Sequence, residues 1–140
     1  MTYPDVKSFM IVLYDQIHEE FYGFEPKKGL KRCDDIEDMA YLIEKLLVKI
    51  SDEYKKTGIR MPHKVIVIDE VDCFSHQEKA FTLLVKHVLK GNLGNTRTSI
   101  VGIANSVDLP FRKKHSAIAM RDTQLLFKPY DVEDIESIVT

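Results

Sequence analysis

Tryptophan is absent from this chain of 140 residues, and cysteine is rare. The two cysteines, Cys33 and Cys73, stand far apart, so the chain has neither a CxxC motif nor a disulfide framework, and we expect reduced thiols in the cytosol or nucleus. No apolar run is long enough to cross a membrane, and the first residues do not resemble a secretory signal, so we expect no membrane contact. The histidines have no zinc-ligand spacing to one another or to the cysteines.

An excess of charge of one sign is also lacking, because 20 basic side chains face 22 acidic ones and the net charge is −2. This balance excludes a nucleic-acid-binding charge signature over the whole chain, so any basic surface must be local. The basic run at residues 27–32 could contact phosphates, and a solvated loop is the other interpretation. An apolar content of 44% is enough for one domain with a hydrophobic core.

A phosphate-binding loop is missing as well. Such a loop needs the pattern Gly-x-x-x-x-Gly-Lys-Ser/Thr, because its backbone N–H groups and its lysine hold the phosphates of a nucleotide. The glycine-rich stretch at residues 91–96 has no lysine at the required position and follows a predicted helix instead of a strand. These residues therefore do not encode a complete P-loop nucleotide site.

The most informative stretch that is present reads Lys-Val-Ile-Val-Ile-Asp-Glu-Val-Asp, at residues 64–72. Its consecutive β-branched residues predict a central strand of a parallel sheet, buried on both faces beneath helices. Ligands of open α/β sheets bind at the carboxyl ends of strands, where buried acids are costly unless they hold a cation or activate water. The alternative is a buried strand that ends in a solvated acidic turn.

Apolar periodicity predicts that helices and strands alternate along the chain. We expect helices at residues 5–21, 34–56, 75–90, about 108–119 and 131–139. We expect strands at residues 65–68, 99–104 and 124–127. This order predicts an α/β fold with a parallel sheet and helices on both of its faces.

The ends of three helices have recognisable signals. Thr2 is predicted to cap the first helix, and Gly58 is predicted to end the second. The sequence Ser-His-Gln-Glu at residues 75–78 has the form of a capping box, which predicts that the third helix starts at Ser75.

A polar residue, Asn105, follows the second predicted strand. Because the carboxyl ends of parallel strands meet at one edge of the sheet, we expect Asn105 to lie near Asp69 and Glu70. A neutral amide beside a carboxylate can orient a water molecule for attack on a γ-phosphate and can sense whether that phosphate is present. An ordinary turn residue is the alternative for Asn105.

Three segments occur in an informative order and spacing. They read Asp-Glu-Val-Asp at residues 69–72, Gly-Ile-Ala-Asn-Ser-Val-Asp-Leu-Pro-Phe-Arg at 102–112 and Leu-Phe-Lys-Pro-Tyr at 126–130. Together they resemble the AAA+ ATPase domain of the replication initiators. These initiators are the large subunit of the origin recognition complex and the cell division control protein that joins it in loading the replicative helicase.

The resemblance implies a role for each matching residue. Asp69 would coordinate Mg²⁺, Glu70 would be the catalytic base, Asp72 is the family's further acid and Asn105 would be the sensor-one residue. The implied cofactors are ATP and Mg²⁺, both expected only together with a phosphate-binding loop. The implied partners are origin DNA, other subunits of the origin recognition complex and helicase-loading factors, and the implied location is the nucleus.

Two arginines are implied to contact the nucleotide. Arg112 matches the arginine that ends the family's Asp-Leu-Pro-x-Arg run, although Phe111 stands where an acid is often found. The short helix that follows lacks the family's Ser-Arg pair and has Ala-Met-Arg at residues 119–121 instead. Arg121 is the candidate for an arginine finger, and the alternative is that no finger is present.

The implied fold is a three-layer P-loop (AAA+) sandwich without the strand of its phosphate-binding loop. Residues 1–58 would supply two helices, residues 59–130 the Walker B and sensor-one strands through the last strand, and residues 131–140 the start of the lid region. Truncation of an origin-binding ATPase is one interpretation. A non-catalytic AAA+-like interaction subunit of the origin complex is the alternative, and another P-loop switch or helicase-loading ATPase is a third possibility.

Overall fold

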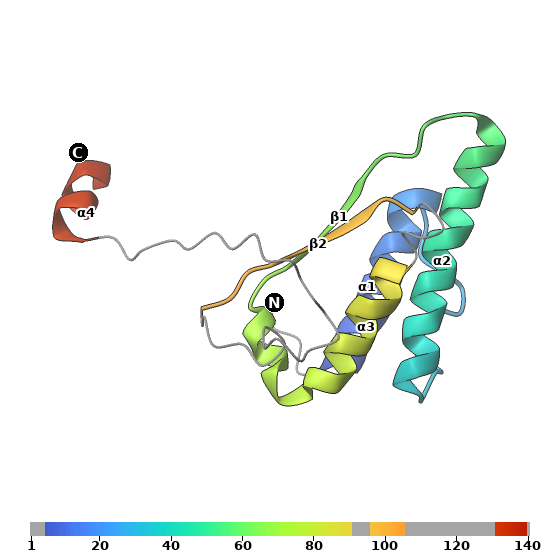
Figure 1. Ribbon diagram of the computed structural model, residues 1–140, viewed down its shortest axis with the longest axis horizontal. Helices are drawn as coiled ribbons and strands as arrows, with labels where there is room; N and C mark the ends of the chain where they lie inside the picture. Colours follow the sequence, from blue (N-terminus) through green and yellow to red (C-terminus); the bar gives the residue numbers. More distant parts are fainter. Residues whose placement is uncertain (1–4, 91–95, 106–130, 140) are drawn as a thin grey trace.

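The computed structural model describes residues 5–90, 96–105 and 131–139 as a mixed α/β structure that is mostly helical (Figure 1). The sheet in these residues has two parallel strands. In chain order the elements are α1 (Val6–Tyr22), α2 (Ile36–Thr57), β1 (Lys64–Ile68), the 3₁₀ helix η1 (Val71–Gln77), α3 (Glu78–Lys90), β2 (Thr98–Gly102) and α4 (Val132–Val139).

The first helix is capped by a different residue from the one predicted. Asp5 is the N-cap of α1, and its carboxylate accepts a hydrogen bond from the Ser8 N–H at 2.6 Å. The prediction that Thr2 caps this helix is therefore wrong, because the aspartate directly before the helix satisfies a free N–H group of the first turn. The helix ends at Gly23, whose left-handed φ of 77° lets its N–H donate to the Glu19 carbonyl.

The second predicted helix is confirmed, with a later start. α2 begins at Ile36 because the carboxylate of Asp35 accepts a hydrogen bond from the Glu37 N–H at 2.7 Å and caps the helix. Gly58 ends α2 as predicted, in the left-handed conformation with a φ of 70°. Both ends of this helix are therefore set by local signals in the sequence.

The third helix starts without the predicted capping box. η1 continues directly into α3 at Glu78, so Ser75 lies inside η1 and the capping-box prediction is wrong. Gln77 instead reaches another helix, where its Oε1 accepts a hydrogen bond from the Val6 N–H at 2.7 Å. This bond satisfies a free donor at the start of α1 and fixes that helix to the joint between η1 and α3.

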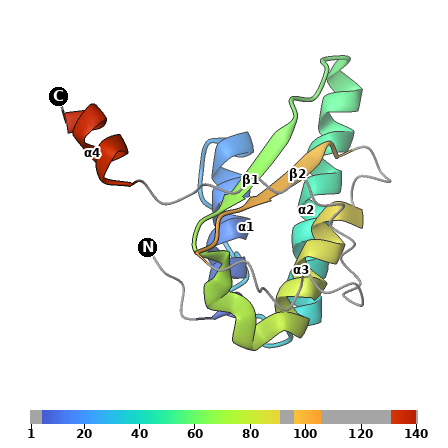
Figure 2. The ribbon, with the colours of Figure 1, turned by 60° about the vertical axis from the view of Figure 1, so that its left-hand side comes forward.

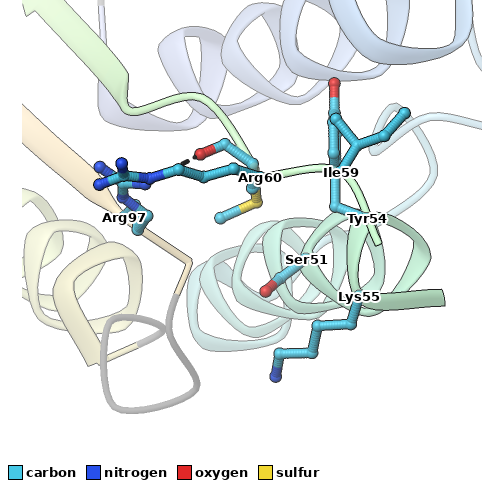
Figure 3. Close-up of a pocket in the computed structure, with 7 residues that line it drawn as sticks. Ser51, Tyr54, Lys55, Ile59, Arg60 and Arg97 are labelled. Carbon is cyan, nitrogen blue, oxygen red and sulfur yellow. Dashed lines mark hydrogen bonds between the residues drawn. The ribbon is translucent and has the colours of Figure 1, made fainter. Parts of the chain in front are cut away.

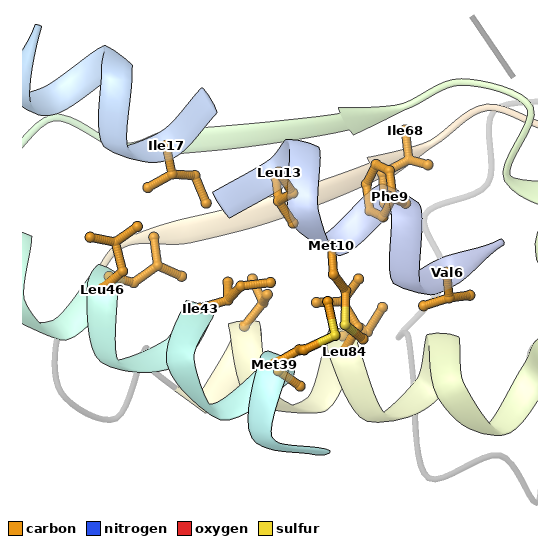
Figure 4. Packing of buried hydrophobic residues seen from close by; sticks show 14 of the residues in the cluster. Val6, Phe9, Met10, Leu13, Ile17, Met39, Ile43, Leu46, Ile68 and Leu84 are labelled. Atoms are coloured by element: carbon orange, nitrogen blue, oxygen red, sulfur yellow. The ribbon is translucent and has the colours of Figure 1, made fainter. Parts of the chain in front are cut away.

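The helices α1, α2 and α3 lie on the same side of the sheet (Figures 1 and 2). Figure 4 shows the core between these helices, with Ile68 reaching it from β1, and Ile66 and Ile100 pack against the same core. On the opposite face of β1, Val65 and Val67 are 56% and 59% exposed. Successive side chains of a strand point to opposite faces, and the described helices cover only one face of the sheet. For these residues, the prediction of a strand buried on both faces is therefore wrong. The prediction of helices on both faces of the sheet is wrong for the same reason.

The last predicted helix is confirmed as α4. The Asp131 N–H donates to Asp134 Oδ2 at 3.1 Å, and the Asp134 N–H donates to Asp131 Oδ1 at 2.8 Å, which is a reciprocal cap. All residues of α4 are exposed, including the apolar Val132, Ile135 and Ile138.

Three sequence predictions lie outside the described residues. They are the end of the third helix at residues 91–95, the short helix at about 108–119 and the strand at 124–127. Within the described ranges, no helix is both long and apolar enough to cross a membrane.

Candidate functional site

The carboxyl ends of β1 and β2 meet at one edge of the sheet because the strands are parallel and paired in register. Just beyond β2, the Ile103 N–H donates to the Ile68 carbonyl at 2.8 Å. The Ile103 carbonyl accepts from the Val71 N–H at 2.9 Å. Asp69 and Glu70 therefore lie between two backbone hydrogen bonds to a single residue of the neighbouring segment.

Gly102 allows η1 to approach the end of β2 closely. A Cβ atom at Gly102 would lie 3.3 Å from Val71 Cγ1, which is tighter than ordinary contact. Val71 and Phe74 are 4% and 1% exposed, so η1 enters the core directly after the two acids. The chain thus makes a sharp turn at Asp69 and Glu70 and leaves both residues on the surface.

The backbone at the two acids is held in a defined conformation. Asp69 Oδ1 accepts a hydrogen bond from the Glu70 N–H at 2.8 Å. Glu70 has a φ of 52°, in the left-handed region that is unfavourable for a residue with a Cβ atom. Such conformations are found at tight turns and at functional sites.

Cys73 and Asp72 lie in the first turn of η1, next to Glu70. Burial raises the pKa of the Cys73 thiol, and the negative charges of Asp72 and Glu70 raise it further. A thiol with a raised pKa stays protonated at neutral pH, so Cys73 is a poor nucleophile. The effect on the thiol also indicates that the carboxylates of Asp72 and Glu70 lie near it.

Asn105 lies at the same edge of the sheet, at an exposed bend just after Ile103. The two backbone hydrogen bonds of Ile103 connect this bend to the segment that contains Asp69 and Glu70. In the described part of the chain, no hydrogen bond joins Asn105 to either acid. The sensor role of Asn105 therefore stays a prediction.

The described residues do not form a metal site of three or more ligands, since no such group of histidine, cysteine or acidic side chains converges among them. Mg²⁺ bound with a nucleotide usually takes only one or two protein carboxylates, and phosphates and water supply its other ligands. Asp69 fits this requirement because it is exposed at the end of a strand, with Oδ1 bound to the Glu70 N–H and Oδ2 as the candidate ligand atom.

Arg112 and Arg121, which the resemblance assigns to nucleotide contacts, lie outside the described residues. The basic run at residues 27–32 is anchored by Leu30, which is 1% exposed, while its lysines and its arginine are exposed. This exposure agrees with the interpretation of the run as a solvated loop.

The sequence interpretation missed a basic group at the other end of the sheet. The ammonium of Lys64, the first residue of β1, donates to the Thr96 carbonyl and to Met61 Sδ. Burial and the nearby charge of Arg97 lower the pKa of Lys64 to about 8. The signal in the sequence was a lysine at the head of an apolar strand.

Comparisons with protein-family models, with curated proteins and with solved structures found no match for this chain.

Proposed function

We propose that this chain is part of an AAA+ ATPase of the replication-initiator kind, in which β1, β2 and the residues after them form half of an ATP-hydrolysing site. The main support is the pair of backbone hydrogen bonds that Ile103 makes with Ile68 and Val71. These bonds hold Asp69 and Glu70 at the edge of the sheet where Asn105 also lies. P-loop hydrolysis needs acids after one parallel strand and a polar side chain near the attacking water, and this edge offers both.

Each polar residue has a distinct task in the proposed site. Asp69 would hold Mg²⁺, and Glu70 would accept a proton from the attacking water. When bound, ATP would supply the γ-phosphate, and Mg²⁺ would neutralise the charge that develops on it. Asn105 would orient the water, and Arg112 and Arg121 are the candidates for contacts to the nucleotide.

The proposal includes the setting in which initiators act. It places the protein in the nucleus, on origin DNA, together with other origin recognition complex subunits and helicase-loading factors. The support for this part is the order and spacing of the three segments at residues 69–72, 102–112 and 126–130.

A non-catalytic AAA+-like subunit of the origin complex is the second candidate, and the missing phosphate-binding loop favours it. If Asp69 and Glu70 were buried, their desolvation would destabilise a subunit that binds no cation, which would argue against this candidate. Asp69 and Glu70 are exposed, however, so water solvates them and no such cost arises. The chemistry of this edge must therefore be tested directly.

The test uses the longer protein that the ATPase candidate requires, in which a phosphate-binding loop is encoded in the same reading frame as this chain. Glu70→Gln should abolish ATP hydrolysis while ATP stays bound, because an amide cannot accept the proton of the attacking water. Glu37→Gln removes an exposed acid from the first turn of α2 and is the matched control, with both properties unchanged. Hydrolysis by Glu70→Gln at the wild-type rate would refute the proposed base.

The genomic DNA upstream of the Met1 codon distinguishes the two candidates. An in-frame strand followed by Gly-x-x-x-x-Gly-Lys-Thr would support the ATPase. A transcript that starts at Met1, with no such sequence upstream, would support the non-catalytic subunit.

A further inference from the structure

A pocket of about 530 Å³ lies at the end of the sheet opposite to Asp69 and Glu70. The end of α2, the loop that follows it and the residue before β2 form its walls (Figure 3). Arg60 and Arg97 lie on one side of the pocket in this view, and Lys55 projects from α2.

The pocket has an excess of positive charge. Lys55, Arg60 and Arg97 line it, and no acidic side chain is among the described residues of the lining. Lys55 does pair with Asp52 at 3.8 Å, but both side chains are more than half exposed, so the solvent screens this contact strongly. Among the described residues, the wall thus offers three cations to an anion and no competing carboxylate.

Arg97 is fixed in place from two sides. Its Nη1 donates to the Met61 carbonyl at 3.2 Å, and its own carbonyl accepts from the Lys64 N–H at 2.8 Å. Its backbone has a φ of 50°, which is unfavourable for a residue with a Cβ atom. A guanidinium carries several N–H donors, so the bond to Met61 leaves others for a ligand.

The positive charge of Arg97 also affects the pKa of Lys64, which lies next to the pocket. The lowered pKa of Lys64 arises first from burial and then from the charge of Arg97. An anion bound at Arg97 would offset this repulsion and would raise the pKa of Lys64 again.

We propose that this pocket binds the phosphate group of an organic phosphate ester, with Arg60 and Arg97 as hydrogen-bond donors and Lys55 as an additional positive charge. Guanidinium groups match the geometry of phosphate oxygens and are the preferred partners where bidentate contacts form. The volume is within the range of small-molecule sites and exceeds what a bare phosphate needs. Ile59 and Tyr54 line the pocket and offer apolar surface to the organic part.

The phosphate could belong to a free nucleotide or to the backbone of DNA, and both have the chemistry that the pocket requires. The inference does not depend on ATP hydrolysis, because the pocket shares no residue with the edge that contains Asp69, Glu70 and Asn105. A failure of the proposed ATPase would therefore leave it intact.

The test titrates the 140-residue chain with inorganic pyrophosphate, with AMP and with a short DNA duplex, while NMR follows the side-chain Nε–H signals of its arginines. We expect the signals of Arg60 and Arg97 to shift and the pKa of Lys64 to rise when a phosphate binds. Binding of AMP without the duplex identifies a free phosphate ester, and preferential binding of the duplex identifies the DNA backbone. The inference is overturned if neither AMP nor the duplex shifts these arginine signals, and a shift with pyrophosphate alone overturns it too.

Variants separate a built site from general attraction to a basic surface. Arg60→Gln and Arg97→Gln should each weaken binding by about tenfold or more, the effect of losing one charge-assisted hydrogen bond. Lys56→Gln removes the neighbouring exposed charge of α2, which does not line the pocket, and should change binding by less than about twofold. An equal loss in Lys56→Gln would overturn the inference. Arg60 is exposed, so its variant tests the site even if Arg97→Gln proves unstable.

Discussion

Replacement of Lys64 by methionine should stabilise the protein at neutral pH. The ammonium of Lys64 is partly buried, 5.5 Å from the centre of the Phe21 ring. Burial, and after it the charge of Arg97, lowers the pKa of Lys64 from 10.5 to about 8. Because the folded-state pKa lies below the unfolded-state value, the unfolded chain binds this proton more tightly. At pH 7 the charged lysine therefore costs stability, and an unbranched apolar side chain of similar length removes that cost.

The size of the effect follows from the shift in pKa. A shift from 10.5 to about 8 corresponds to an upper limit of about 3 kcal/mol in the free energy of unfolding. Partial solvent access reduces this value, and the lost hydrogen bond to the Thr96 carbonyl offsets about 1 kcal/mol of it. The Thr98 hydroxyl also donates to that carbonyl, at 3.4 Å, so the carbonyl keeps a partner. We expect Lys64→Met to be more stable than the wild type by about 1 kcal/mol at pH 7.

Urea unfolding at a series of pH values between 7 and 10 would measure the effect. As the pH rises from about 8 toward 10.5, Lys64 loses its proton in the folded state first, so the wild type should gain stability relative to the variant. Tyr14, Tyr22 and Cys73, whose pKa values are raised by burial, are present in both proteins, so their contributions cancel in this difference. Lys56→Met, at an exposed position of α2, is the control and should show no such trend. A constant difference between wild type and Lys64→Met from pH 7 to 10 would refute the reasoning.

Three further predictions concern the helices. Asp5→Ala should lower the free energy of unfolding by about 1 kcal/mol in thermal melts, whereas Asp5→Asn keeps the cap. The hydrogen bond from the Ser8 N–H lowers the pKa of Asp5 below 3.8. The charged carboxylate therefore adds to the free energy of unfolding above that pH, and this contribution should disappear as the pH falls through the folded-state pKa. Gln77→Ala leaves the Val6 N–H without its acceptor and should cost about 1 kcal/mol, while Gln77→Glu should cost less. Leu47 is 0% exposed, so Leu47→Ala should cost about 2 to 5 kcal/mol in urea unfolding, and a cost below about 1 kcal/mol would contradict the packing of α2.

Local patterns in the sequence predicted most of the described elements. The helical spacing of apolar residues in α1 and α2 reflects the face that each helix buries, and Gly58 ends α2 because it takes the left-handed conformation with little strain. Helix starts were harder to predict. Thr2 and Asp5 both have side chains that can cap a helix, and sequence alone did not rank them correctly.

Features that depend on distant residues could not be predicted. The run at residues 65–68 is equally apolar whether one or both faces of the strand are covered, so its sequence could not reveal that Val65 and Val67 are exposed. The basic pocket joins Lys55 and Arg60 to Arg97, which is far away in the sequence, and only the pairing of β1 with β2 brings them together. The edge with Asp69, Glu70 and Asn105 could be predicted because parallel strands place their carboxyl ends together.

The edge of β1 that has no neighbour among the described residues has a consequence for the behaviour of the protein in solution. In the described residues β1 has a neighbour on one edge only, and its β-branched run could pair with the same run of another molecule. Lys64 precedes this run, and Asp69 and Glu70 follow it directly. Charges that flank an aggregation-prone strand act as gatekeepers, since stacking in register would bring like charges together. We therefore expect the two acids to oppose self-association, and their replacement by neutral residues should lower solubility whatever chemistry they perform.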